Sequence, residues 1–320
     1  SAFPPNQFVN VLGSRAQPLC NSNDSVFVLE KGIYTFSSTV YFPRNKKLII
    51  KEGTRINLKN NARFVSYSPV EIRGSKENPV EFFSTDQKGG GLVIIPNGGH
   101  VDLEHVKFSN LGAGNTKNWI LTGAVTIYEG EVEISNCLFT GNNCEDALNL
   151  IRCHFDISES MISETQSDGF DADFCKGTIR NCQFKNTGND CIDFSGSQIK
   201  IESCNINGSG DKGISGGERS ILEIVNWNIK NASIAIASKD NSDVVVLDTD
   251  ISNCSYAFAA YQKKAEFGPS SLRVKSANLS NVSNDQLLEL DSKISFKGKE
   301  YVGKETFDID SMYSVFTKSL

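Results

Sequence analysis

Hydrophobic and polar residues alternate in short runs along most of the chain, and the runs recur at a fixed interval. Counting from Asp146 in steps of 22 residues aligns six segments whose third residue is always apolar: Leu148, Phe170, Ile192, Ile214, Ile236 and Phe258. Within each segment, apolar residues alternate with polar or small ones, which is the period of a β-strand. Turns rich in Gly, Asn, Asp and Ser separate the runs. A repeat of this length is typical of a solenoid.

A second apolar run follows in each repeat and is read as a second strand: GTIRNCQF from residue 177, QIKIESCNI from 198, ILEIVNWNI from 221 and VVVLDTDI from 244. The sequence lacks the tight Leu and Asn spacing of leucine-rich repeats and the period of helical repeats. The pattern therefore predicts an all-β right-handed parallel β-helix, with coils of about 22 residues stacked roughly 4.8 Å apart. We expect one domain over residues 1–320, with an N-terminal cap at 1–30, the β-helix at 31–285 and a C-terminal cap at 286–320 that covers the open strand edge.

Charge and composition argue against several classes of function. The net charge of −6 and the pI near 5.3 argue against a general nucleic-acid binder. No apolar run approaches the roughly 18 residues that a membrane span requires. The chain starts at Ser1 without a signal-peptide pattern, so we expect a processed form or one module of a longer protein with further domains. Nine cysteines without a CxxC pair do not indicate zinc. Stacked, buried thiols explain them best, and a disulfide between neighbouring coils is the alternative.

Acidic residues gather at the outward positions of two adjacent coils. Because strand residues alternate between faces, this geometry predicts an outer surface that carries Asp168, Asp171, Asp173, Asp190 and Asp193, with Arg152, Lys212, Arg219 and Lys239 around them. Two like charges about 4.8 Å apart repel by roughly 3.5 kcal/mol at an effective dielectric constant of 20. Such a stack requires cations, a metal ion, hydrogen bonds or a shared proton.

Two explanations fit these aspartates. At the turns, Asp146, Asp168 and Asp190 are placed to accept hydrogen bonds from backbone N–H groups, which is a structural role. Asp171, Asp173 and Asp193 lie in mid-strand, where aspartate is unfavourable, so a functional role explains them better.

Three stretches on successive coils resemble the polygalacturonases, which hydrolyse pectin: Ser167-Asp168-Gly169-Phe170-Asp171, Gly188-Asn189-Asp190-Cys191-Ile192 and Gly210-Asp211-Lys212-Gly213-Ile214-Ser215. The family reads Asn-Thr-Asp-Gly-Phe-Asp, Gly-Asp-Asp-Cys-Ile and Gly-His-Gly-Leu-Ser there. The resemblance implies a β-helical hydrolase in which Asp168 and Asp190 carry over. Asn189 replaces the carboxylate usually assigned as the general acid, and Asp211-Lys212 replaces the histidine. More broadly, the chain is similar to the β-helix proteins that act on or bind polysaccharides.

The first hypothesis is a polysaccharide lyase or glycoside hydrolase acting on an acidic glycan in an Asp-rich groove on the outer face. Its catalytic candidates are Asp168, Asp171, Asp190, Asp193, Lys212 and Lys239. Its substrate-binding candidates are Arg152, Asp173, Glu218, Arg219 and Asp240. In a lyase, Asp171, Asp173 and Asp193 would hold Ca²⁺ as cofactor, and Lys212 or Lys239 would act as the base. In a hydrolase, two carboxylates would act as acid and base.

The alternative is a glycan-binding or structural module without turnover. The sequence does not separate lyase, hydrolase and binding module. A polysaccharide partner in turn suggests an extracellular or periplasmic location.

Overall fold

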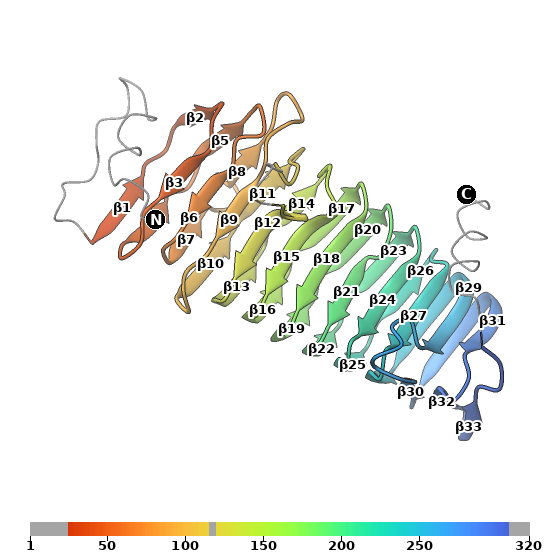
Figure 1. Ribbon diagram of the computed structural model, residues 1–320. Helices are drawn as coiled ribbons and strands as arrows, with labels where there is room; N and C mark the ends of the chain where they lie inside the picture. The colour runs from red at the N-terminus through yellow and green to blue at the C-terminus, as the bar shows by residue number, and fades with distance from the viewer. Residues whose placement is uncertain (1–24, 115–119, 307–320) are drawn as a thin grey trace. The chain divides into compact units, whose positions relative to one another are not determined.

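The computed structural model describes residues 25–114 and 120–306, which form β-strands joined by turns (Figure 1). None of the described residues belongs to a helix that could cross a membrane. The chain divides into two compact units, residues 1–166 and 167–320, here called the N-terminal and C-terminal units. The expectation of a single domain stays a prediction.

Each coil of the N-terminal unit contributes one strand to each of three parallel ladders. The first face holds β1 (Val26–Leu29), β4 (Lys47–Ile50), β7 (Val70–Arg73), β10 (His100–Glu104), β13 (Glu131–Ser135) and β16 (His154–Ser158). The second face holds β2 (Ile33–Phe36), β5 (Arg55–Leu58), β8 (Val80–Phe83), β11 (Val106–Ser109), β14 (Leu138–Thr140) and β17 (Met161–Thr165). The third face holds β3 (Val40–Phe42), β6 (Phe64–Ser66), β9 (Leu92–Ile94), β12 (Gly123–Tyr128) and β15 (Asp146–Ile151).

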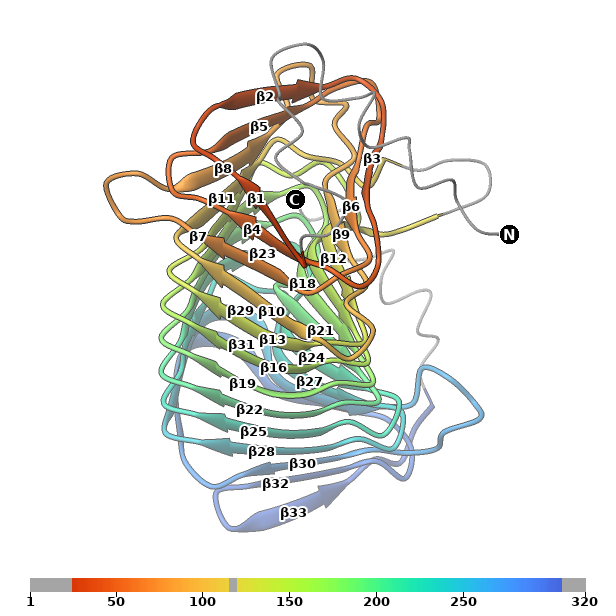
Figure 2. The ribbon, with the colours of Figure 1, turned by 90° about the vertical axis from the view of Figure 1, so that its left-hand side faces the viewer.

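The C-terminal unit repeats this three-faced plan. Its first face holds β19 (Lys176–Arg180), β22 (Gln198–Glu202), β25 (Ile221–Val225), β28 (Asp243–Leu247), β30 (Ser271–Val274), β32 (Lys293–Phe296) and β33 (Lys299–Val302) (Figure 2). Its second face holds β20 (Gln183–Thr187), β23 (Asn205–Ser209), β26 (Asn228–Lys230), the start of β29 (Thr249–Tyr261) and β31 (Ala277–Leu288). Its third face holds β18 (Asp168–Asp173), β21 (Ile192–Ser195), β24 (Lys212–Gly217), β27 (Ile234–Lys239) and the ends of β29 and β31.

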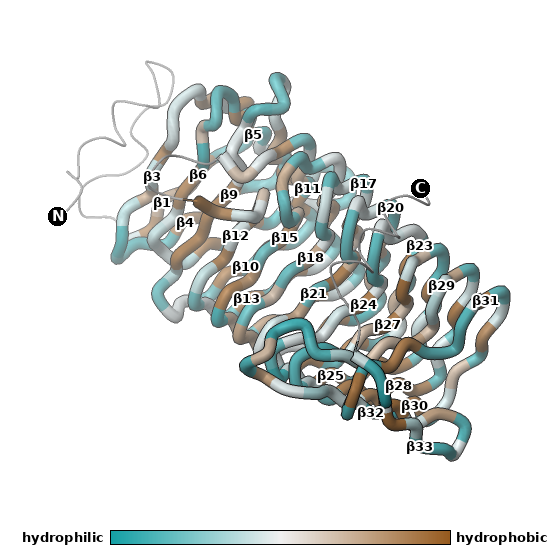
Figure 3. The backbone as a smooth tube through the Cα atoms, turned by 45° about the vertical axis from the view of Figure 1, so that its right-hand side comes forward, coloured by the Kyte–Doolittle hydropathy of each residue, from teal (hydrophilic) through white to brown (hydrophobic). Residues whose placement is uncertain are grey.

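The register follows the sequence repeat. On the third face of the C-terminal unit, Phe170 pairs with Ile192, Ile192 with Ile214, Ile214 with Ile236, and Ile236 with Phe258. These five side chains are buried, and polar and apolar segments alternate along the strands (Figure 3). The predicted parallel β-helix is therefore confirmed.

The coils have three strands where the sequence suggested two. The run GTIRNCQF bends at Asn181, whose φ of 54° lies in the left-handed region. The equivalent residues of the following coils, Ser203, Asn226 and Asp248, have φ values of 56°, 57° and 48°. Asn and Asp adopt this conformation more readily than other non-glycine residues. The bend therefore divides the second run between the first and second faces.

The core is filled by stacked columns of apolar side chains. In the N-terminal unit, Phe64, Phe82, Phe108 and Phe139 follow one another with ring centroids 5.9, 5.4 and 4.9 Å apart. The eight cysteines in the described residues are free thiols, as expected, and several donate to the carbonyl two residues before them. Burial raises the pKa of the Cys191 thiol to about 12, so it remains protonated at neutral pH.

The β-helical strands extend beyond the predicted range of 31–285. At the start, β1 pairs in parallel with β4, so residues 26–29 belong to the first coil rather than to a cap. At the end, β32 pairs in parallel with β30, and only β33 turns back to pair antiparallel with β32. Residues 1–24 and 307–320 of the predicted caps lie outside the described residues.

Candidate active site on the third face of the C-terminal unit

The predicted acidic surface lies on β18 and β21. Phe170 and Ala172 point into the core, and Asp171 and Asp173 alternate with them at half-buried positions. Asp171 pairs directly with Asp193, and Asp173 with Ser195, so adjacent coils bring the carboxylates together as predicted. The next coil continues the Asp171–Asp193 column with Ser215.

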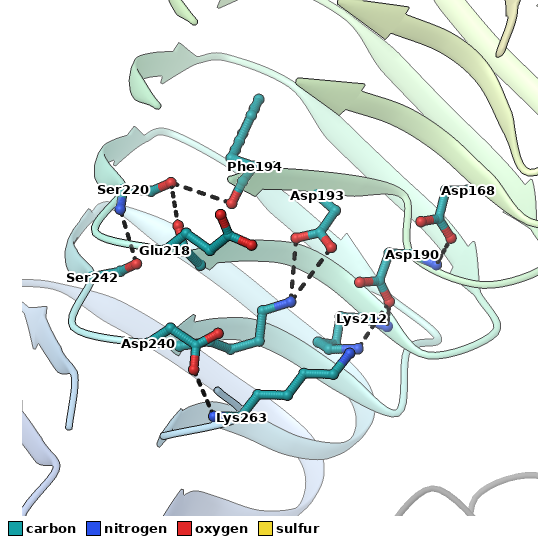
Figure 4. A network of polar contacts seen from close by, with 12 residues as sticks. Asp168, Asp190, Asp193, Phe194, Lys212, Glu218, Ser220, Asp240, Ser242 and Lys263 are labelled. Atoms are coloured by element: carbon teal, nitrogen blue, oxygen red, sulfur yellow. Dashed lines mark hydrogen bonds and ion pairs between the residues drawn. The ribbon is translucent and has the colours of Figure 1, made fainter. Parts of the chain in front are cut away.

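The turn aspartates form a ladder with the backbone of the following coil. Asp168 Oδ1 accepts from the N–H of Asp190 at 3.0 Å and from Asn189 Nδ2 at 2.7 Å. Asp190 Oδ1 accepts in turn from the N–H of Lys212 at 3.0 Å (Figure 4). Each carboxylate therefore satisfies a backbone donor between coils, which is the structural role proposed for these turns.

Lys212 closes this ladder in a buried ionic cluster. Its Nζ lies 3.1 Å from Asp190 Oδ1 and also pairs with Asp211 Oδ2. All three side chains are nearly inaccessible to solvent. Burial raises the pKa of Asp190, and the neighbouring lysine opposes that rise. Lys212 and Asp190, both predicted to be catalytic, thus lie where a glycan does not reach them.

Asp168 is half-buried, and its carboxyl group has a strongly raised pKa. Burial, with the charge of Asp190 next in importance, raises its pKa to about 7. The hydrogen bonds from Asn189 and Asp190 both fall on Oδ1 and only partly oppose this rise. A proton would therefore be carried on Oδ2, and a large fraction of Asp168 is protonated at neutral pH.

Asp193 is held by a cation from two coils away. Lys239 Nζ lies 3.3 Å from Asp193 Oδ1 and 3.4 Å from Oδ2. Its side chain crosses the intervening coil at Gly217, where an added Cβ would lie 3.4 Å from Lys239 Cε. Lys239 itself is buried. The small residue at position 217 therefore lets one lysine neutralise the half-exposed carboxylate of Asp193.

Asp240 and Glu218, both predicted to bind substrate, support the loop after β29. Asp240 Oδ1 accepts from the N–H groups of Lys263 and Lys264, each at 2.7 Å, and Glu218 pairs with the Lys264 ammonium. Burial, followed by the charge of Glu218, raises the pKa of Asp173. Asp240 and Glu218 therefore hold the edge of the site in place.

The two predicted arginines lie in different units. Arg219 is exposed in the C-terminal unit, with its guanidinium carbon 5.5 Å from the centre of the Phe267 ring. Arg152 belongs to the N-terminal unit, where its Nη1 contacts Tyr128 at 3.0 Å and Glu129 at 3.5 Å. Of the two, only Arg219 belongs to the unit that carries the acidic cluster.

Asp171, Asp173 and Asp193 do not fit a ready-made calcium site. Ca²⁺ takes six to eight oxygen ligands, but Asp193 is already neutralised by Lys239. Within residues 25–114 and 120–306, no group of three His, Cys, Asp or Glu side chains is arranged to hold a metal ion. The calcium cofactor stays a prediction, and no chemical step below uses it.

Two polar atoms of the site were not anticipated from the sequence. Asp211 Oδ1 and Ser215 Oγ are buried and have no hydrogen-bond partner in the part of the chain that the structure describes. Ser215 continues the outward column of Asp171 and Asp193, but its burial depends on how side chains pack over the strand. The only sequence signal for Asp211 is its position before Lys212.

Comparisons with known proteins agree with this fold. A family model described as a right-handed β-helix region matches residues 146–292, so the predicted right-handed form is confirmed. Among solved structures, a mutant of the periplasmic alginate epimerase AlgG is 12% identical over 80% of this chain and 79% of its own, with a TM-score of 0.53. An alginate lyase from Paenibacillus sp. str. FPU-7 is 11% identical over 74% and 90%, with a TM-score of 0.47. A DFA-IIIase from Arthrobacter chlorophenolicus A6 is 9% identical over 94% and 93%, also with a TM-score of 0.47.

No curated protein sequence matches the chain. At 12% identity, the likeness to the epimerase shows the fold alone.

Proposed function

We propose that the C-terminal unit carries the active site of a polysaccharide-active enzyme that hydrolyses an acidic glycan. The observation that carries this proposal is the contrast between two carboxyl groups on one face. Asp168 has a pKa raised to about 7, whereas Asp193 is held by the Lys239 ammonium. Two carboxyl groups in such different environments, one with a raised pKa and one paired with a cation, suit the roles of acid and base.

In this proposal, Asp168 is the general acid and protonates the glycosidic oxygen from Oδ2. Asp193 acts as the nucleophile or as the base that activates water. Lys239 pairs with both oxygens of Asp193 and fixes its orientation. Asp190, Lys212 and the backbone ladder position Asp168 without touching the substrate.

The lysines favour hydrolysis over β-elimination. A lyase that used Lys212 or Lys239 as base would need the neutral amine, because a protonated lysine cannot accept a proton. Lys212 pairs with two buried carboxylates and Lys239 with Asp193, and both arrangements favour the charged ammonium.

The proposal of an acidic substrate is based on the positive charges at the edge of the site. Arg219 is exposed there, and Lys263 is exposed on the loop that Asp240 anchors. Arginine suits bidentate contacts with a carboxylate, so a uronic acid polymer is the proposed partner. Such a target implies that the protein works in an extracellular or periplasmic space.

The test is an assay of the purified protein on polygalacturonate and alginate, with and without EDTA. Reducing ends and absorbance at 235 nm are followed together. We expect reducing ends without absorbance, and a loss of roughly 10²- to 10⁴-fold in kcat for Asp193→Asn. Asp250→Asn makes the same chemical change on the second face and should keep full activity. Rising absorbance would instead support the lyase version with Lys239 as base.

One observation favours the non-catalytic alternative. Asp168 and Asp190 both serve backbone donors of the next coil, so the turns need them even without a reaction. Glycan binding by calorimetry together with no turnover of either polymer would favour a binding module.

A further inference from the structure

Phe174 stands out at the turn that follows β18. It comes directly after Asp173, it is 58% exposed, and its φ of 54° is in the left-handed region. A bulky side chain rarely adopts this backbone conformation. The equivalent turn residues of the following coils are Gly196, Glu218 and Asp240, with φ values of 60°, 54° and 54°. The turn therefore imposes the conformation, and position 174 combines it with an exposed aromatic ring.

The Phe174 ring packs against Gly196 of the next coil. A Cβ added at Gly196 would lie 2.7 Å from Phe174 Cδ1 and 2.8 Å from Cε1, closer than real Cβ contacts. Only glycine therefore lets the ring lie against the next coil. Phe174 is thus packed against the glycine backbone of the next coil, while the residue as a whole remains more than half exposed.

The ring lies close to the proposed reaction centre. Gly196 follows the end of β21, three residues after Asp193. At about 3.3 Å per residue, this separation along the coil is roughly 10 Å. A sugar residue stacked on Phe174 would be next to Asp173, and its neighbour in the polymer would extend towards Asp193.

The other aromatic residues near this face are less available. Tyr261, which pairs with Lys239 in the next coil, is buried. Phe267 is covered on one side by the Arg219 guanidinium. Phe174 is therefore the better exposed aromatic surface beside the acidic cluster in the described part of the C-terminal unit.

We propose that Phe174, seated on Gly196, is a stacking platform that binds the apolar face of one sugar ring of the glycan. Pyranose C–H groups pack on the face of an aromatic ring, while the carboxylates beside it contact the polar edge. This inference rests on the proposed function, because it names a subsite next to the Asp168–Asp193 pair. It explains why an exposed phenyl ring occupies a turn position that suits Gly or Asp better.

The test compares binding with stability in the same variants. Affinity for polygalacturonate and alginate oligosaccharides is measured by calorimetry, and Tm by thermal unfolding. For Phe174→Asn we expect about tenfold weaker binding. We also expect an equal or higher Tm, because Asn tolerates a positive φ. Phe174→Trp should retain the affinity. Ile221→Thr, an exposed apolar residue of β25 on the first face, should not change it.

The outcomes separate this inference from the proposed function. Equal binding by the wild type and Phe174→Asn would overturn the platform and leave the proposed function standing. A fall in both Tm and affinity, with no recovery in Phe174→Trp, would also overturn it in favour of a packing role. If the wild type binds neither polymer, both the platform and the proposed function are overturned.

Discussion

The first and third faces of the C-terminal unit are both β-ladders, but their ion pairs differ in how far they are exposed to solvent. On the first face, Arg273 Nη2 pairs with Asp243 at 2.6 Å, and the two side chains are 56% and 38% exposed. On the third face, Lys212 and Asp190 are each only 4% exposed. Exposed ion pairs contribute little to stability. Burying a charge carries a desolvation penalty, and a buried charge without its partner is strongly destabilising. The two faces therefore differ in how strongly their stability should depend on each charged residue.

The largest effect should follow from removing the cation of the buried cluster. Lys212→Met leaves Asp190 and Asp211 buried without their shared ammonium, and we expect a loss of about 3–5 kcal/mol in the free energy of unfolding. Urea denaturation at neutral pH measures this change. The deficit should shrink at acidic pH, where the two carboxyl groups are neutral, and in the triple variant that adds Asp190→Asn and Asp211→Asn. A deficit that is the same at every pH would contradict the electrostatic explanation.

A smaller, pH-dependent effect is expected from Asp168. Its pKa is raised from 3.8 to about 7, so the folded state binds the proton more tightly than the unfolded state. This contribution to stability is complete below pH 4 and is lost as the pH rises through 7. Asp168→Asn removes the titration and keeps an oxygen that can accept from the Asp190 N–H. The stability of the variant relative to the wild type should therefore rise by on the order of 2 kcal/mol between pH 4 and pH 8. This is about half of what the full pKa shift implies, because Asp168 is partly exposed and solvent screens its neighbours.

Denaturation curves at a series of pH values measure that difference. Asp250→Asn, on the second face, is the control and should run parallel to the wild type. A constant gap between Asp168→Asn and the wild type would show that Asp168 does not titrate in this range.

The smallest effect is expected on the first face. Arg273→Ala removes an exposed ion pair with Asp243, and we expect a change below about 0.5 kcal/mol that disappears in high salt. The measurement is urea denaturation at low and high ionic strength. A loss comparable to that of Lys212→Met would mean that the two faces do not differ in how they hold charge.

The repeat made much of this fold predictable. A step of 22 residues places Asp171 beside Asp193 and Ile192 beside Ile214, and the structure pairs them in this way. Register follows from sequence here because each coil has nearly constant length and one apolar column must stay inside. The third strand of each coil was missed, because the bend at Asn181 interrupts a run that alternates like one strand.

The direction of long side chains was not predictable in the same way. Lys239 reaches Asp193 across an intervening coil, and Lys212 folds onto Asp190 and Asp211 instead of pointing to solvent. The alternation along a strand predicts on which face each Cβ lies. A lysine side chain has four further rotatable bonds, and only its packing determines their torsion angles. The sequence therefore identified the acidic surface but not which of its members are buried.

The reach of Lys239 also limits how this part of the chain can change in evolution. A β-helix gains or loses length most easily by whole coils, because each insertion restores the same register. The pair formed by Asp193 and Lys239 bridges two coil steps, with Gly217 beneath the crossing side chain. Deleting the coil between them would bring the lysine one step too close, and duplicating it would put the ammonium out of range. Indels of whole coils should therefore be tolerated on either side of residues 193–239 sooner than within them.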